Sequence, residues 1–253
     1  MCRHLAYLGP PVTVASLVLE PVHGLLHQSY APADMRGGGT VNADGFGAGW
    51  YAEPGGEATR FRSAVPIWSE QSFPDVARAA CSPAVLAAVR SATTGMPVTV
   101  TAAAPFAEGR WLFSHNGVVR GWPHSVAKLA AGLPVTDLLT LDAPTDAALV
   151  WALVRHDLRA GIDPAEVLAD VVGEVDRAAP GSRLNLLLTD GATIWATTWD
   201  HALSVRGTAD TALVASEPID HDQGWRAVPD RHLVVATPGN VTIRPLHETG
   251  NPA

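Results

Sequence analysis

The 253-residue sequence predicts an α+β protein in which two largely antiparallel sheets stack face to face with helices outside, a four-layer αββα sandwich. Short β-rich segments occur toward both ends of the chain, and two amphipathic helices lie between them. Several of these segments are continuous apolar runs, which indicates strands covered on both faces. Other α+β folds remain compatible with this order of elements.

Nine segments are predicted as strands, five before the helices and four after them. They are residues 3–8, 45–53, 59–62, 85–91, 111–115, 184–189, 193–199, 212–216 and 233–237. Apolar residues recur at three- and four-residue intervals in the predicted helices, over residues 145–159 and 163–177. Thr145 is the expected N-cap of the first helix, and Pro164 suits the first position of the second.

One domain over residues 1–253 is expected, because sandwiches of this size remain undivided. The turn-rich stretches at residues 37–39, 55–56 and 102–105 are too short for linkers. A hydrophobic content of 47% and a charged content of 17%, below the ~25% of typical soluble domains, favour a large core.

The formal charge of −8 disfavours a nucleic acid partner, which would require clustered lysine and arginine. The apolar run at residues 12–19 falls short of the ~20 residues that span a bilayer, so no membrane partner is expected. No segment has the pattern of a signal peptide, which predicts a cytoplasmic location.

No cofactor and no metal are expected. Neither a phosphate-binding loop nor a dinucleotide fingerprint is present. His23 and His27 stand four residues apart, but no third ligand completes a metal pattern. Cys2 and Cys81 are the two cysteines, and their spacing does not suggest a disulfide.

Cys2 follows the initiator methionine, and removal of Met1 would leave a cysteine with a free α-amine. A thiol at a chain start has its own proton acceptor, because an α-amine has an ordinary pKa of ~7.7 to 8.0 against ~8.5 for a thiol. The sequence therefore offers Cys2 as a nucleophile. The alternative is a buried thiol in the first strand.

Three further positions carry chemistry suited to such a nucleophile. Asn116 and Gly117 follow an apolar strand, where a sharp turn would direct two N–H donors at an oxyanion, although an ordinary Asn-Gly turn explains them equally well. Arg90 ends another strand and can hold a carboxylate through two hydrogen bonds. Asp146, at a helix start, can accept from an α-ammonium or complement the helix dipole.

Together these motifs resemble the class II glutamine amidotransferases, which are N-terminal nucleophile hydrolases. The matching residues are Cys2-Arg3, Arg90 with Ala92-Thr93 and Gly95, His115-Asn116-Gly117, and Thr145-Asp146, over roughly the first two thirds of the chain. The resemblance implies the αββα fold and an amidohydrolase. It assigns attack to Cys2, the oxyanion hole to Asn116 and Gly117, and glutamyl binding to Arg90, Thr93, His115 and Asp146.

The start of the chain and residues 42–51 are similar to the amidohydrolase family of ergothioneine biosynthesis, which removes glutamate from γ-glutamyl hercynylcysteine S-oxide. The glycines of that segment are expected to let its backbone approach closely beside the strand that carries Cys2. Gly121 and Ala148 stand where the wider family often has Asn and Glu, which predicts altered leaving-group contacts. Trp68 and Trp122 are candidate walls for the trimethylammonium of that leaving group.

Two alternatives remain open at this point. One is a stand-alone glutaminase subunit that passes ammonia to a separate synthase, and it would require efficient turnover of free glutamine. The other is a non-catalytic module that binds glutamyl ligands, in which Cys2 would be unreactive toward a γ-glutamyl electrophile. The sequence does not predict the oligomeric state.

Overall fold

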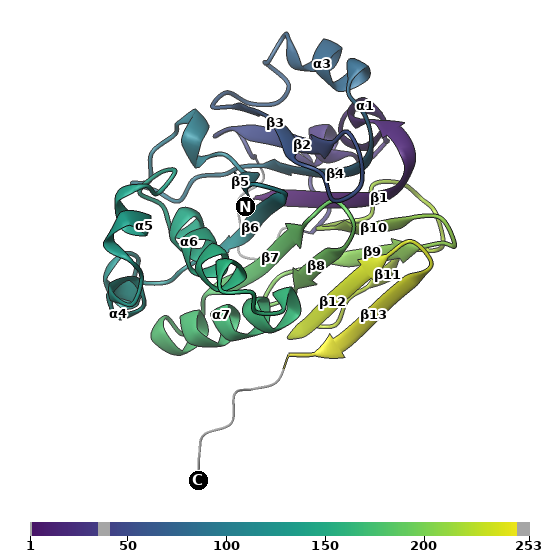
Figure 1. Cartoon of the computed structure of the whole chain (residues 1–253). Helices are drawn as coiled ribbons and strands as arrows, with labels where there is room; N and C mark the ends of the chain where they lie inside the picture. Colours follow the sequence, from purple (N-terminus) through teal and green to yellow (C-terminus); the bar gives the residue numbers. More distant parts are fainter. Residues whose placement is uncertain (1, 35–40, 247–253) are drawn as a thin grey trace.

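The computed structural model describes residues 2–34 and 41–246; Met1 and the glycine stretch at residues 37–39 lie outside this range. Two antiparallel sheets form the centre of the molecule (Figure 1). The first contains β1 (Arg3–Thr13), β2 (Phe46–Tyr51), β3 (Ala58–Ser63), β4 (Cys81–Val89), β9 (Ser204–Gly207), β10 (Ala212–Ala215) and β11 (Arg226–Ala227). Their order across the sheet is β11-β9-β10-β1-β4-β2-β3, so the strand that carries the chain start lies in the middle.

The second sheet contains β5 (Phe106–Glu108), β6 (Trp111–Val118), β7 (Arg183–Thr189), β8 (Ile194–Thr197), β12 (His232–Thr237) and β13 (Asn240–Pro245), in the order β13-β12-β8-β7-β6-β5. The two long helices are α6 (Asp146–Arg159) and α7 (Pro164–Ala178). Short helices are α1 (Val14–Val18), α2 (Leu25–Gln28), α3 (Phe73–Ala79), η1 (Val100–Ala102), η2 (His124–Val126), α4 (Ala127–Ala131) and α5 (Val135–Leu139). Within the described residues, no helix is long and apolar enough to cross a bilayer.

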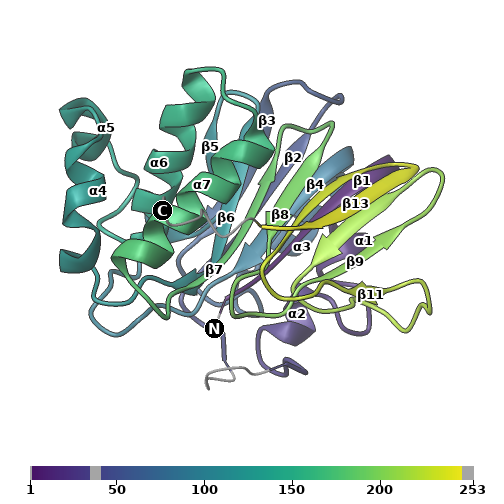
Figure 2. The ribbon, with the colours of Figure 1, turned by 90° about the horizontal axis from the view of Figure 1, so that it is seen from below.

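Three apolar clusters define four layers. One lies between the second sheet and helices α6 and α7, which cover its outer side (Figure 2). One lies between the two sheets. The third joins the outer face of the first sheet to α1 and α3. The alternation of β1 fits this arrangement, because Leu5 belongs to the outer cluster while Ala6 and Leu8 belong to the central one. The predicted αββα sandwich is confirmed.

The two long helices begin where their caps predict. The side chain of Thr145 accepts from the backbone N–H of Ala148 at 3.2 Å. Asp163 caps α7 in the same way, and Pro164 takes the first helical position. Capping chemistry is local in sequence, which explains why these starts are predictable.

All nine predicted strands are present, and three of them are clearly longer than predicted. β1 continues to Thr13, β4 begins already at Cys81, and β6 continues to Val118. The sequence pattern misses β5, β9, β11 and β13. β11 has two exposed residues and carries no hydrophobic period. β13 does alternate, with half-buried Val241 and Ile243 between exposed residues, and the sequence interpretation missed this short edge strand.

The glycines of β2 permit close approach, but to a different partner from the one predicted. β4 separates β2 from β1, so these glycines do not lie beside the nucleophile strand. A Cβ on Gly47 would lie 2.5 Å from the carbonyl oxygen of Ala104, and one on Gly49 would lie 2.6 Å from a methyl of Leu112. The glycines therefore bring β2 against the second sheet and the loop that precedes it.

Candidate active site

Cys2 lies directly before β1, where the chain meets the end of β4. The β1–β4 ladder pairs Arg3 with Val89, which brings Cys2 beside the residues that follow β4. The backbone N–H of Ser91 lies 3.5 Å from the sulfur of Cys2, and the sulfur lies 3.7 Å from the carbonyl oxygen of Ser91. The thiol is half-buried and therefore accessible from one side.

A pocket opens at this thiol. It is lined by the end of β4 with its following loop, the end of β6 and the start of α6, and also by Ala102 of η1 and Phe106 of β5. Six of the seven residues predicted for the site line it: Cys2, Arg90, Thr93, His115, Gly117 and Asp146. Asn116 is not among the lining residues. The fold thus brings together residues that the sequence holds far apart.

Arg90 stands at the rim, and its guanidinium is held by backbone carbonyls. Nη1 donates to the carbonyl of Pro97 at 2.9 Å and to that of Asp44 at 3.4 Å. Asp44 in turn accepts from the N–H of Ala92 at 2.8 Å, which joins the loop before β2 to the loop after β4. Arg90 lines the pocket, and a guanidinium has five N–H donors, so its fork retains donors for a carboxylate.

Asp146 occupies the first turn of α6 and is 6% exposed. Its Oδ1 accepts from the N–H of Ala147 at 2.8 Å and its Oδ2 from that of Val119 at 2.9 Å. These bonds fix the carboxylate at the pocket wall. Each carboxylate oxygen has a second lone pair, so the side chain can accept an ammonium while it satisfies the helix start.

The structure corrects the predicted turn at Gly117. β6 continues through Val118, and Gly117 pairs with Leu184 inside the ladder. Glycine is required there because a Cβ would lie 1.8 Å from the carbonyl oxygen of Arg183. The first positive φ comes only at Gly121, with φ 70°, a conformation that accounts for glycine at this position.

Asn116 is fully buried, and its face of β6 is directed toward the first sheet. On the same face, Ser114 Oγ lies 3.2 Å from His4 Nδ1. The Nδ2 of Asn116 donates to Ser216 Oγ at 3.1 Å, which uses one of its two N–H groups. Its Oδ1 has no hydrogen-bond partner within the described part of the chain.

Two histidines near the thiol have different surroundings. His115 lines the pocket, with its Nε2 2.9 Å from the carbonyl oxygen of Arg183. Burial, and then the nearby His201, His115 and Arg3, lower the pKa of His4 from 6.5 to about 3. His4 is therefore neutral at physiological pH and packs between the sheets.

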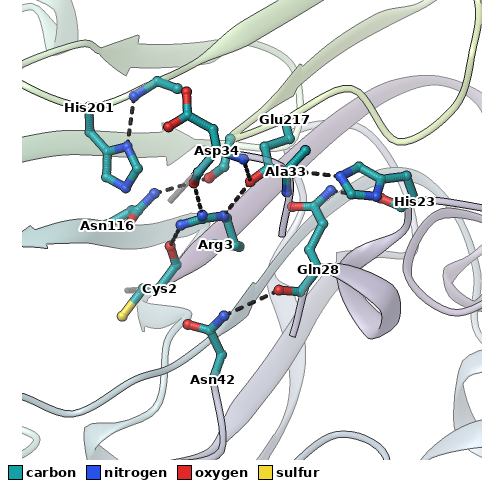
Figure 3. Close-up of polar contacts among 12 residues, drawn as sticks. Cys2, Arg3, His23, Gln28, Ala33, Asp34, Asn42, Asn116, His201 and Glu217 are labelled. Carbon is teal, nitrogen blue, oxygen red and sulfur yellow. Dashed lines mark hydrogen bonds and ion pairs between the residues drawn. The ribbon is translucent and has the colours of Figure 1, made fainter. Parts of the chain in front are cut away.

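Residues 217–222 have the polar composition of a solvated loop, which gives Glu217 no expected role, but the structure buries its side chain. Glu217 is 3% exposed and forms an ion pair with Arg3, the neighbour of Cys2, at 2.8 Å (Figure 3). The available signal was Arg3 itself, because a charged residue in a buried strand requires a buried partner.

His23 and His27 contact one another. Their Nδ1 atoms lie 3.0 Å apart, and His23 Nε2 lies 2.7 Å from Glu217 Oε2. Among the residues that the structure describes, no group of three or more His, Cys, Asp or Glu side chains is arranged to hold a metal ion.

The two candidate tryptophans differ in their position. Trp122 lines a hollow that shares Thr93 and Met96 with the thiol pocket. Trp68 is 45% exposed, packs edge-on against Tyr30 and lines neither of these two hollows. Trp122 is thus the better placed of the two to meet a group that extends from the thiol pocket.

Comparison with known proteins gives consistent results. The family model described as "Glutamine amidotransferases class-II" matches residues 25–209. The γ-glutamyl-hercynylcysteine sulfoxide hydrolase of Mycolicibacterium smegmatis is 46% identical over 97% of this chain and 100% of its own length. The Mycobacterium tuberculosis protein of the same name is 45% identical over 100% of both chains. Glutamine phosphoribosylpyrophosphate amidotransferase from B. subtilis shares the fold, with a TM-score of 0.69 at 13% identity over 97% of this chain and 49% of that one.

Proposed function

Because this chain belongs to the class II glutamine amidotransferases, we propose that it hydrolyses a γ-glutamyl amide with Cys2 as nucleophile, and that its substrate is γ-glutamyl hercynylcysteine sulfoxide. The observation that carries the proposal is the pocket at Cys2, which unites a thiol, a guanidinium and a helix-start carboxylate. Identity of 45–46% over the whole chain to two hydrolases of that name supports the substrate.

The glutamyl group supplies two charges that the pocket complements. The α-carboxylate would bind the free donors of Arg90, and the α-ammonium would bind Asp146, with Thr93 and His115 beside them. The γ-carbonyl would then lie at the sulfur of Cys2. Binding at both charges fixes the reacting carbon, and orientation of this kind accounts for a large part of a catalysed rate.

In the proposed reaction, Met1 has been removed and the α-amine of Cys2 takes the proton of the thiol. The sulfur attacks the γ-carbonyl, and the oxyanion accepts hydrogen bonds from the second N–H of Asn116 Nδ2 and from the backbone N–H of Gly117. The resulting ammonium protonates the leaving amine as the C–N bond breaks. Water then hydrolyses the thioester and releases glutamate.

The leaving group carries a quaternary ammonium, and we propose that Trp122 receives it. It lines the hollow that adjoins the thiol pocket through Thr93 and Met96. A cation over an indole face gains ~0.5 to 2 kcal/mol.

The experiment that tests this function measures glutamate release by the purified protein from γ-glutamyl hercynylcysteine sulfoxide and from free glutamine. We expect the sulfoxide to be turned over far more efficiently and Cys2→Ala to release no glutamate while its circular dichroism spectrum is unchanged. Equal or better turnover of glutamine would assign the chain to ammonia supply. Retained turnover in Cys2→Ala would overturn the mechanism.

A further inference from the structure

A buried arginine holds the backbone of the nucleophile residue. Arg3 is 1% exposed, and its Nη1 donates to the carbonyl oxygen of Cys2 at 3.0 Å. Its Nη2 donates to the carbonyl oxygen of Asp34, and its Nε donates to Glu217 Oε1 at 2.8 Å. In Figure 3 the guanidinium lies between Cys2 and Glu217, and the sulfur of Cys2 points away from it.

The carboxylate of Glu217 contacts Arg3 and three further groups. Its Oε2 lies 2.7 Å from His23 Nε2 and accepts from the backbone N–H of Ala33 at 2.8 Å, while its Oε1 accepts from that of Asp34 at 3.1 Å. Burial raises the pKa of Glu217, but His23, the two N–H groups and Arg3 together lower it below the ordinary 4.5. Glu217 is therefore ionised at neutral pH and can fix the guanidinium.

Ser216, the residue before Glu217, forms hydrogen bonds with the nucleophile strand and with Asn116, the proposed oxyanion donor. Ser216 Oγ accepts from the backbone N–H of His4 at 3.0 Å and from Asn116 Nδ2 at 3.1 Å. The N–H of Ser216 donates to the carbonyl of His4 at 2.9 Å, which extends the β1–β10 pairing by one bond. Two consecutive residues at the end of β10 thus contact both the nucleophile strand and the proposed oxyanion donor.

We infer that Glu217 is a positioning residue for the hydrolysis: through Arg3 it fixes the carbonyl of Cys2, and thereby the direction of the sulfur and the α-amine. This inference rests on the proposed function, since it takes Cys2 as the nucleophile. A hydrogen bond to the carbonyl of Cys2 fixes the peptide plane to which its Cα is attached, and that Cα carries both the sulfur-bearing side chain and the α-amine. Outer hydrogen-bond partners orient reacting groups in the same way at metal sites.

The test compares Glu217→Gln with Asp220→Asn. Asp220 is the matched control, because it lies on the same loop and is ion-paired, but with Arg206 at 2.9 Å and not with Arg3. We expect Glu217→Gln to lower kcat for γ-glutamyl hercynylcysteine sulfoxide by about 10- to 100-fold, since a small displacement of a reacting group costs up to that much. KM should change by less than about threefold, because Arg90 and Asp146 remain in place. Asp220→Asn should leave both constants near those of the parent.

A double variant distinguishes a positioning role of Glu217 from a purely structural one. Glu217→Gln alone removes the carboxylate that faces the buried guanidinium of Arg3, whereas Arg3→Met combined with Glu217→Gln removes both charges, a change that proteins often tolerate. We expect the double variant to regain most of the melting temperature lost in the single one while kcat stays at least about tenfold low, because Cys2 has lost its donor. Recovery of kcat together with the melting temperature would overturn the inference.

The Cys2→Ala variant keeps the two proposals distinguishable. If Cys2→Ala is inactive and Glu217→Gln retains a kcat within about twofold of the parent, the inference fails and the proposed function stands. If Cys2→Ala retains turnover, the function and the inference fail together.

Discussion

The backbone N–H of Ser91 lies 3.5 Å from the sulfur of Cys2, so the residue after the proposed carboxylate clamp directly contacts the proposed nucleophile. The link follows from the β1–β4 ladder, in which Arg3 pairs with Val89. Glutamyl recognition at Arg90 and attack at Cys2 are therefore fixed by one pair of strands. A substitution that weakens glutamyl binding without slowing attack, or the reverse, is therefore expected in the other elements of the pocket, such as the end of β6 and the start of α6.

Replacing Asn116 by alanine should lower kcat by about 100- to 1000-fold with little change in KM, because one oxyanion donor is lost. Asn185 is the matched control. It is the buried asparagine directly across the β6–β7 ladder, and its side chain holds Ala202 and Trp199 instead. Asn185→Ala should lower the melting temperature but leave kcat within a few-fold. Steady-state kinetics on both variants checks the difference, and equal losses of kcat would remove Asn116 from the mechanism.

Asp146→Asn should raise KM by about 10- to 100-fold, since a hydrogen bond to a charged group contributes roughly 1.5–3 kcal/mol. Asp163 offers a comparison, because it also stands at a helix start and accepts backbone N–H groups. Asp163→Asn should change neither KM nor the melting temperature by much, because asparagine caps a helix about as well as aspartate. Substrate titrations and thermal melts of both variants separate binding from capping. A lower melting temperature with an unchanged KM in Asp146→Asn would show that its carboxylate only caps α6.

Trp122→Leu should lower kcat/KM for γ-glutamyl hercynylcysteine sulfoxide by about 2- to 30-fold, the range of one cation–π contact. The loss should vanish with a γ-glutamyl substrate whose leaving group has no quaternary ammonium. Trp68 lies outside both hollows, so Trp68→Leu should leave kcat/KM unchanged with either substrate. A loss in Trp122→Leu that is the same for both substrates would argue against a leaving-group contact.

The buried His4 predicts a loss of stability in mild acid. Its folded pKa of about 3 lies below the ordinary 6.5, so between these values the unfolded chain binds a proton that the folded chain does not. The free energy of unfolding should therefore fall by about 1.4 kcal/mol per pH unit below pH 6.5 from this residue.

Urea denaturation at pH 7 and pH 5 measures this loss, and His4→Leu should reduce it. The exposed His124, replaced by glutamine, is the control and should leave the loss unchanged. An identical pH dependence in His4→Leu and in the parent would show that His4 is not the group responsible.

The layers of the fold and the long helices were predictable because their signals are local. Thr145 and Asp163 cap helices through residues two or three positions away, and an apolar run predicts a covered strand without knowledge of its partner. The family resemblance proposes seven residues for the site, and six of them line one pocket.

What the sequence could not supply are contacts between distant segments. Gly117 is required by the carbonyl of Arg183 on the adjacent strand, which a local pattern interprets as a turn. Glu217 lies 214 positions from Arg3, so its burial depends on the pairing of β10 with β1. A sequence segment that carries a buried counter-ion can have the same composition as a solvated polar loop, so only the fold shows which of the two is present.

The central claim is that Cys2 attacks a γ-glutamyl carbonyl with its own α-amine as base. The most direct measurement is mass spectrometry of the N-terminal peptide after incubation with 6-diazo-5-oxo-norleucine, a γ-glutamyl electrophile. We expect a peptide that begins at Cys2, without Met1, and carries one adduct on its sulfur, while Cys81 is unmodified. An unmodified Cys2 in a fully active preparation, or an active protein that retains Met1, would contradict it.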